Sequence, residues 1–373
     1  MLKQLSIATA AAALAVAAAA AQSDGESASG PFAIETVAGG LNHPWSLAFL
    51  PDGSMLVTER EGRLRVIRNG ALDPEPVAGT PDAYVRSQAG YFDIVLHPEF
   101  AENHVVFLSY AHGTARANAT RVARAVFDGK AFQNFKVIFE VRPLKNTAAH
   151  YGGRMAFTPD GKLLITTGEG FDFRERAQKL DTTMGKIVRI NEDGSVPADN
   201  PFVGEKGALP EIWTYGHRNP QGLAVDPETD IIYMHEHGPR GGDEINIVER
   251  GANYGWPIAT YGIDYSGAII SPYTEYEGTV QPIKYWVPSI APSGLAVYRG
   301  PLFPDWDGDL LVGALAGKAL HRVDMENGAV AGEEILLKDL NTRIRDVRAG
   351  PDGAIYVTTD KDDGEVLRLT PRE

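Results

Sequence analysis

One short pattern recurs six times along the chain: an apolar strand, a tight turn often spelled Pro-Asp-Gly, and a second apolar strand. The copies span residues 45–58, 92–110, 154–168, 222–236, 294–315 and 346–360. Strand pairs repeated at a spacing of roughly 50 to 70 residues are typical of radial β architectures with four-stranded blades. The pattern therefore predicts an all-β chain, a six-bladed β-propeller with four-stranded antiparallel blades over residues 31–373. A pair of β-sandwiches is the alternative, but it does not explain six copies in one register.

The composition excludes several functions. The formal net charge of −14 argues against a nucleic-acid partner, because phosphate binding needs a basic face. The absence of cysteine excludes disulfides, thiolate catalysis and cysteine-ligated metal sites. No Gly-x-Ser-x-Gly motif indicates a serine hydrolase.

The first residues have the pattern of a targeting segment. Lys3 precedes an alanine-rich apolar stretch over residues 5–21, which ends in small residues suited to cleavage. A membrane anchor is the alternative, but the stretch is only modestly hydrophobic. We therefore expect a cleaved signal peptide over residues 1–22, a flexible spacer over 23–30, export to the periplasm, and no membrane span in the mature chain.

The register of the repeats places polar side chains together. Residues just before the first strand and just after the second strand of each blade converge on one mouth of the central channel. The residues aligned there include Gln88, His150, Arg218, Asn219, Arg343 and Arg345. Three arginines and a histidine in an acidic protein predict a small anionic ligand, since the planar guanidinium matches carboxylates. His150 is the best candidate for a general base, and a structural histidine is the alternative.

A Gly-Pro-rich turn follows the fourth repeat, in residues 235–244. Its backbone carbonyls and its two acidic residues are the hard oxygen ligands that calcium prefers. The His-x-His spacing also fits zinc, but no HExxH motif supports that interpretation. A solvated acidic loop is the third possibility.

Several motifs together resemble the soluble pyrroloquinoline-quinone (PQQ) dependent sugar dehydrogenases, and more closely their aldose sugar dehydrogenase branch. The similarity covers nearly the whole mature chain, and this family has the six-bladed propeller fold expected above. The motifs are His150-Tyr-Gly-Gly-Arg154, Tyr215-Gly-His-Arg-Asn-Pro-Gln-Gly-Leu223, His237-Gly-Pro239, Asp243-Glu-Ile-Asn246, Asn253-Tyr-Gly-Trp-Pro257 and Arg343-Ile-Arg-Asp346.

The resemblance implies a role for each candidate residue. His150 would remove the proton of the sugar's anomeric hydroxyl, and Arg218 would stabilise the charge that develops as hydride reaches the quinone. The residues that would hold the quinone are Gln88, Arg218, Asn219, Arg343 and Arg345. The carbonyls of Gly238 and Pro239 would bind a calcium ion at the cofactor, and Glu244 and Tyr254 match a second, structural calcium site.

The sequence departs from the family at two positions. A lysine that the family often places on the fifth blade falls at Ala316, and Lys318, on the same strand face, is expected to reach the cofactor instead. An acidic residue that some relatives carry before the catalytic histidine is Ala149 here, which removes a possible partner of the imidazole.

The function expected is that of a periplasmic quinoprotein oxidising aldoses to lactones, with an electron acceptor that the sequence does not identify. The alternative from another class is a non-catalytic propeller that binds a glycan or protein partner at the same mouth. A calcium-dependent lactonase is a third possibility, but it needs several carboxylates around one metal, whereas this mouth is cationic.

Overall fold

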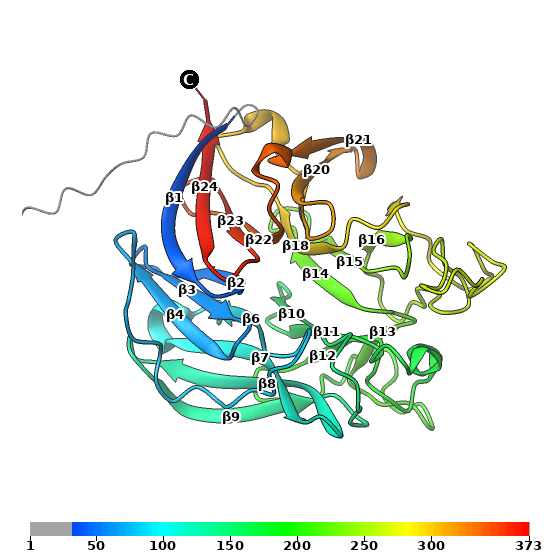
Figure 1. Cartoon of the computed structure of the whole chain (residues 1–373). Helices are drawn as coiled ribbons and strands as arrows, with labels where there is room; N and C mark the ends of the chain where they lie inside the picture. The colour runs from blue at the N-terminus through cyan, green and yellow to red at the C-terminus, as the bar shows by residue number, and fades with distance from the viewer. Residues whose placement is uncertain (1–31, 373) are drawn as a thin grey trace, which may run out of the picture.

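The computed structural model describes residues 32–372, so the expected signal peptide and spacer lie outside the described part. Within that part, the chain forms six separate four-stranded antiparallel sheets arranged as a β-propeller, which confirms the predicted fold (Figure 1). The first strands of neighbouring sheets contact one another and surround the middle of the ring.

Each blade except the last is built from consecutive strands. The first blade comprises β2 (Pro44–Phe49), β3 (Met55–Glu59), β4 (Arg63–Arg68) and β5 (Ala71–Leu72). The second comprises β6 (Tyr91–Leu96), β7 (Val105–Thr114), β8 (Ala117–Phe127) and β9 (Phe132–Glu140). The third comprises β10 (Gly152–Phe157), β11 (Leu163–Thr167), β12 (Lys186–Ile190) and β13 (Ile212–Tyr215). The fourth comprises β14 (Pro220–Val225), β15 (Ile232–Glu236), β16 (Asp243–Ile247) and β17 (Lys284–Trp286). The fifth comprises β18 (Pro292–Val297), β19 (Leu310–Ala314), β20 (Ala319–Glu326) and β21 (Ala329–Leu336).

The sixth blade joins the two ends of the described chain. It comprises β22 (Ile344–Ala349), β23 (Ile355–Thr359), β24 (Gly364–Pro371) and β1 (Phe32–Leu41), and β1 pairs antiparallel with β24. The helical elements are short, namely α1 (Phe100–Asn103) and the 3₁₀ turns η1 (Arg174–Gln178), η2 (Pro304–Trp306) and η3 (Lys338–Leu340). Among residues 32–372, no helix is long and apolar enough to cross a membrane.

The recurrent Pro-Asp-Gly turn has a local physical cause. Gly53 adopts φ +84°, a left-handed conformation that a side chain disfavours. The carboxylate of Asp52 accepts the backbone N–H of Ser54 at 2.9 Å, and the N–H of Gly53 donates to the carbonyl of Leu50 at 3.0 Å. The turn thus reverses the chain between two buried strands and sets their register.

The apolar core is divided among the junctions between blades. Leu56 and Leu108 belong to a cluster shared by the first and second blades, and Phe107 and Ile165 belong to one shared by the second and third. Corresponding clusters fill the four remaining junctions around the ring. Because each sheet is covered on both faces by its neighbours, the second strands of the first, third, fifth and sixth blades (β3, β11, β19 and β23) are buried along their whole length.

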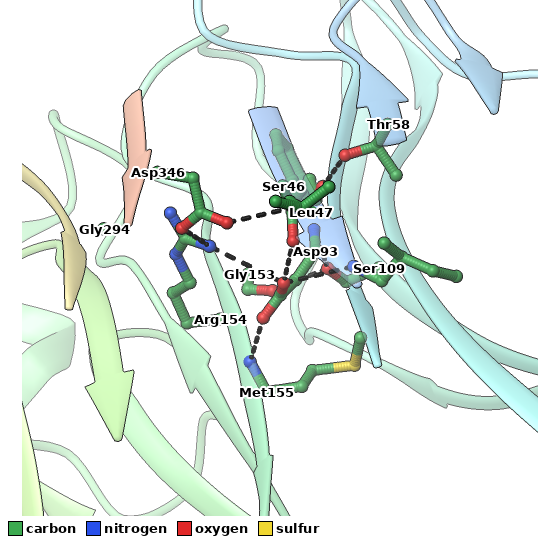
Figure 2. Close-up of polar contacts among 12 residues, drawn as sticks. Ser46, Leu47, Thr58, Asp93, Ser109, Gly153, Arg154, Met155, Gly294 and Asp346 are labelled. Carbon is green, nitrogen blue, oxygen red and sulfur yellow. Dashed lines mark hydrogen bonds and ion pairs between the residues drawn. The ribbon is translucent and has the colours of Figure 1, made fainter. Parts of the chain in front are cut away.

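A buried polar network ties the first strands together near the channel axis (Figure 2). Arg154 of β10 lies 2.9 Å from Asp346 of β22, and Asp346 accepts the backbone N–H of Leu47 in β2 at 3.1 Å. Asp93 of β6 accepts the hydroxyl of Ser46 at 2.5 Å. These side chains join the first, second, third and sixth blades in a region without solvent access, where an unpaired charge would be costly.

Replacing Ser109 by alanine is expected to destabilise the propeller by about 1–3 kcal/mol. The Ser109 hydroxyl donates to the carbonyl of Gly153 at 2.6 Å and accepts the N–H of Asp93 at 2.9 Å, so both backbone groups would lose their partner (Figure 2). Denaturant unfolding of S109A measures the change, with the exposed S195A as control. Equal stability of the two variants would contradict the expectation.

Candidate active site

A cavity of about 260 Å³ opens where residues before the first strands meet residues after the second strands. It brings together four of the predicted cofactor-binding residues, namely Gln88, Asn219, Arg343 and Arg345. The remaining lining residues are Trp45, Arg60, Phe92, Tyr151, Gly152, Gln221, His237, Ala291 and Leu315. Cationic and amide side chains therefore face an apolar wall, an arrangement that suits a flat anionic ligand.

Arg343 and Arg345 share one carboxylate, which the sequence analysis did not single out. Asp360 accepts the Nη2 of Arg343 at 2.9 Å and the Nη2 of Arg345 at 2.8 Å, and its other oxygen lies 2.7 Å from Nδ1 of His43. Burial alone would raise the pKa of Asp360, but Arg345, His43 and Arg343 hold that pKa far below its ordinary value. Asp360 thus fixes both guanidinium groups at the cavity wall while neutralising only part of their charge.

Arg60 is a further cation that sequence reasoning missed. It follows β3 directly, lines the cavity, and forms no side-chain ion pair with any residue of the described part. Three arginine cations and the single carboxylate of Asp360 leave the cavity wall positively charged. This surplus favours a ligand with more than one carboxylate.

His150 lies beside this cavity in a left-handed conformation, with φ +52°. Its backbone N–H donates to the Gln88 side chain at 2.8 Å. The buried Lys145 ammonium donates to the carbonyls of Ala149 and His150. A Cβ atom at Gly168 would stand 2.3 Å from the His150 carbonyl, so the close approach of the two segments requires glycine there. The histidine is therefore held in place from three sides.

The His150 imidazole does have a carboxylate partner, contrary to the expectation drawn from Ala149. Its Nδ1 lies 2.9 Å from Oε1 of Glu169, which comes just after β11. Burial lowers the pKa of His150, and the positive charges of Arg218, His237 and Lys145 lower it further. Burial also raises the pKa of Glu169 to about 7. An ionised Glu169 can only accept, so it places the proton on Nδ1 and leaves Nε2 as the basic atom.

Arg218 links the histidine to the turn after β15. Its Nη1 donates to the carbonyls of His237 at 2.9 Å and Gly238 at 2.6 Å, and its own carbonyl accepts the N–H of Glu169 at 2.9 Å. The guanidinium also lies over the ring of Trp256, at 5.3 Å from its centroid. The two predicted catalytic residues, Arg218 and His150, are therefore close enough for the guanidinium charge to lower the pKa of the imidazole.

The first predicted calcium site does not fit the present arrangement. The carbonyl of Gly238 accepts from the Arg218 guanidinium, so a calcium ion on Gly238 and Pro239 would face a second cation. Among residues 32–372, no group of three or more histidine, aspartate or glutamate side chains is placed to hold a metal. Calcium binding at this turn would require Arg218 to turn away.

The second predicted site fits a cation better. Glu244 is partly buried opposite the buried Glu236 in the β15–β16 pair, and desolvation together with the charge of Glu236 raises the pKa of Glu244 to about 8. Glu244 and Tyr254 line one small cavity, and the nearby Asn246 Oδ1 is buried without a donor in the described part of the chain. Two carboxylates at paired strand positions and an unpaired amide oxygen form a hard oxygen set of the kind that binds calcium.

Three predicted cofactor residues lie outside the cavity lining. Arg218 lines two smaller neighbouring cavities instead. Ala316 and Lys318 occupy the turn between β19 and β20, and both are exposed. Lys318 Nζ donates to the Asn341 side chain at 3.1 Å. In this sector the lining comes from Leu315 and Ala291 instead.

Fold and site together define a propeller with an arginine-lined cavity at the channel mouth, beside a buried histidine–carboxylate pair. Residues 41–368 match the family model described as Glucose / Sorbosone dehydrogenase, and the chain belongs to this family. It is thus a sugar dehydrogenase, which confirms the resemblance seen in its motifs.

The chain is similar to individual proteins over most of its length. It is 44% identical to the aldose sugar dehydrogenase YliI of Escherichia coli over 91% of this chain and 93% of that protein. The apo crystal structure of the soluble aldose sugar dehydrogenase of Escherichia coli matches with a TM-score of 0.88 at 42% identity, over 91% of this chain and all of that one. The PQQ-bound aldose sugar dehydrogenase of Streptomyces coelicolor matches with a TM-score of 0.75 at 29% identity, over 91% of this chain and 98% of that one.

Proposed function

We propose that the protein oxidises aldoses at the anomeric carbon to lactones, with PQQ as the bound electron acceptor. The observation that supports this most strongly is the cavity lined by Arg60, Arg343 and Arg345, next to the buried His150, in which only Arg343 and Arg345 share a carboxylate, that of Asp360. A quinone with three carboxylates would match that charge. The name of the aldose sugar dehydrogenase relative and the PQQ-bound structural neighbour support the same assignment.

The quinone fits the donors present in the cavity. Arg343 and Arg345 would bind its carboxylates, and the amides of Gln88, Asn219 and Gln221 would orient its edge. When bound, the quinone supplies a two-electron acceptor for the hydride of the anomeric carbon. Calcium has no step in this mechanism, because the Gly238 carbonyl already accepts a hydrogen bond from Arg218. We propose Glu244 and Tyr254 as a structural calcium site only.

The chain's own residues would move the proton. His150 Nε2 would take the proton of the anomeric hydroxyl, and Glu169 at Nδ1 would stabilise the resulting imidazolium. The Arg218 guanidinium, already aimed at the carbonyls of residues 237 and 238, would stabilise negative charge that develops nearby.

Reconstitution tests this proposal. Purified apoprotein is titrated with PQQ and Ca²⁺, and reduction of an artificial dye is then followed with a panel of aldoses. We expect saturable quinone binding, aldose-dependent reduction and a lactone product. Quinone binding without oxidation of any aldose would refute the proposal and favour the non-catalytic propeller.

Export is a separate part of the proposal. Residues 1–22 would direct the chain to the periplasm and be removed there. Mass spectrometry of the protein recovered from the periplasm should find a mature N-terminus near residue 23, whereas an intact Met1 would contradict cleavage.

Replacing Arg60 by glutamine is expected to weaken quinone binding about tenfold, since one charge-assisted contact is worth roughly 1.5 kcal/mol. The unpaired guanidinium would lose its charge, whereas the Asp360 cluster would stay intact. Fluorescence titration of the apoprotein with PQQ measures the dissociation constant. The matched control is K318Q, which removes an exposed cation outside the cavity, and an equal effect of the two variants would contradict a specific role of Arg60.

A further inference from the structure

The segment after β11 holds an aromatic residue in an unusual backbone conformation. Phe171 has φ +72°, a region that residues with a side chain seldom occupy. The carbonyl of the preceding Gly170 accepts the hydroxyl of Thr147 at 2.5 Å. Strained conformations that the surrounding structure enforces cluster at functional sites. The backbone conformation of Phe171 therefore sets the direction in which its own ring points.

The Phe171 ring lies directly against the candidate base. It packs edge-to-face on the imidazole of His150, with centroids 5.0 Å apart, yet 42% of the residue is exposed. Tyr265, from the long insertion between β16 and β17, stacks on the Phe171 ring, with centroids 6.3 Å apart and an interplanar angle of 19°. The Tyr265 hydroxyl lies 3.5 Å from Nη2 of Arg218. Two exposed aromatic rings therefore stand next to His150 and Arg218.

An ion pair connects the two segments that present these rings. Arg174 Nη2 lies 3.2 Å from Asp264 Oδ2. Arg174 is three residues after Phe171 and Asp264 directly precedes Tyr265, so this ion pair holds the two segments together. Phe171, Tyr265, Arg174 and Asp264 line one small cavity together with Glu169 and Arg218. Exposed aromatic surface maintained by strain, stacking and an ion pair indicates a binding surface rather than leftover core.

We propose that Phe171 is a specificity-determining residue that packs against the apolar C–H face of an aldopyranose while the anomeric hydroxyl of the sugar reaches His150. A pyranose has a polar rim of hydroxyls and an apolar face of C–H bonds, and an aromatic ring covers such a face well. Tyr265 holds the Phe171 ring in this orientation. This inference rests on the proposed function, because it names how the same site recognises its sugar.

The contact is made in the ground state and the transition state alike, so its loss should change KM and leave kcat nearly constant. We expect F171A holoenzyme to show a KM about tenfold higher for the best aldopyranose of a panel of D-glucose, D-galactose and D-xylose. The quinone dissociation constant should not change, and F171W should restore most of the KM. The control is F135A, which removes an exposed phenylalanine of β9, away from both segments.

Calorimetric titration of the holoenzyme with the same sugars separates this inference from the proposed function, provided that the quinone is chemically reduced beforehand so that it cannot accept hydride. Sugar binding that is weakened by F171A but not by F135A would support the inference even if no aldose is oxidised, which is the result that refutes the proposed function. An unchanged KM and unchanged sugar binding in F171A would overturn the inference. So would a fall in kcat alone, because the ring would then only shield His150.

Discussion

Replacing His150 by glutamine is expected to lower kcat for aldose oxidation about 10³-fold, within the range that a general base contributes. Glutamine is similar in size and polar, but it has no basic nitrogen to take the anomeric proton. The backbone of residue 150 is held by Gln88 and Lys145, so the cavity should keep its shape. Dye reduction by reconstituted H150Q measures the loss.

Quinone titration separates this result from a simple loss of cofactor. H150Q should bind PQQ as the natural protein does, because Arg60, Arg343 and Arg345 are untouched. H112Q, at a partly exposed histidine of β7, should keep full activity. Full activity of H150Q would instead show that His150 is a structural histidine.

The pH dependence of kcat/KM is expected to follow Glu169. Burial raises the pKa of this carboxyl to about 7, so Glu169 is protonated below neutral pH and ionised above it. Only the ionised form holds the proton on Nδ1 of His150 and strengthens Nε2 as a base. The lowered pKa of His150 keeps the imidazole neutral across the same range. Activity should therefore rise from pH 6 to pH 8 and then level off.

Replacing Glu169 by glutamine should remove this rise and lower kcat about 10²-fold. An amide stays neutral at every pH, and it can donate to Nδ1 and so stabilise the wrong tautomer. The control is D172N, an exposed carboxylate in the same segment, which should keep the natural pH profile. An E169Q profile that still rises through neutral pH would assign the titration to another group.

The register of the repeats also predicts site residues that the sequence analysis did not name. Residues before the first strands were singled out, and Gln88, Asn219, Arg343 and Arg345 do line one cavity. Arg60, Glu169 and Asp360 follow the second strands of their blades, at the same mouth, and the same rule would have found them. Their hydrogen-bond partners come from other segments, which is why a strand alignment alone did not indicate their roles.

The register of the repeats does not predict the path of the long insertions or of the turns between strands. Tyr265 reaches Arg218 because the segment between β16 and β17 folds back over the mouth, and no strand period describes that path. Lys318 shares a strand face with Ala316 in the alignment, but the chain turns at φ +49° there and the side chain meets Asn341 instead. The turn, rather than the strand period, decides where that ammonium lies.

The pairing of β1 with β24 has a consequence for how the site is assembled. The blade that contains Arg343, Arg345 and Asp360 lacks its outer strand until β1 has paired with β24. The five other sheets of the described part can form from consecutive segments, whereas this one requires β1 to pair with a strand more than 300 residues further along the chain. The pairing that closes the ring of blades is therefore also the one that completes the blade carrying Arg343, Arg345 and Asp360, and a chain cut short before β24 would lack that closure.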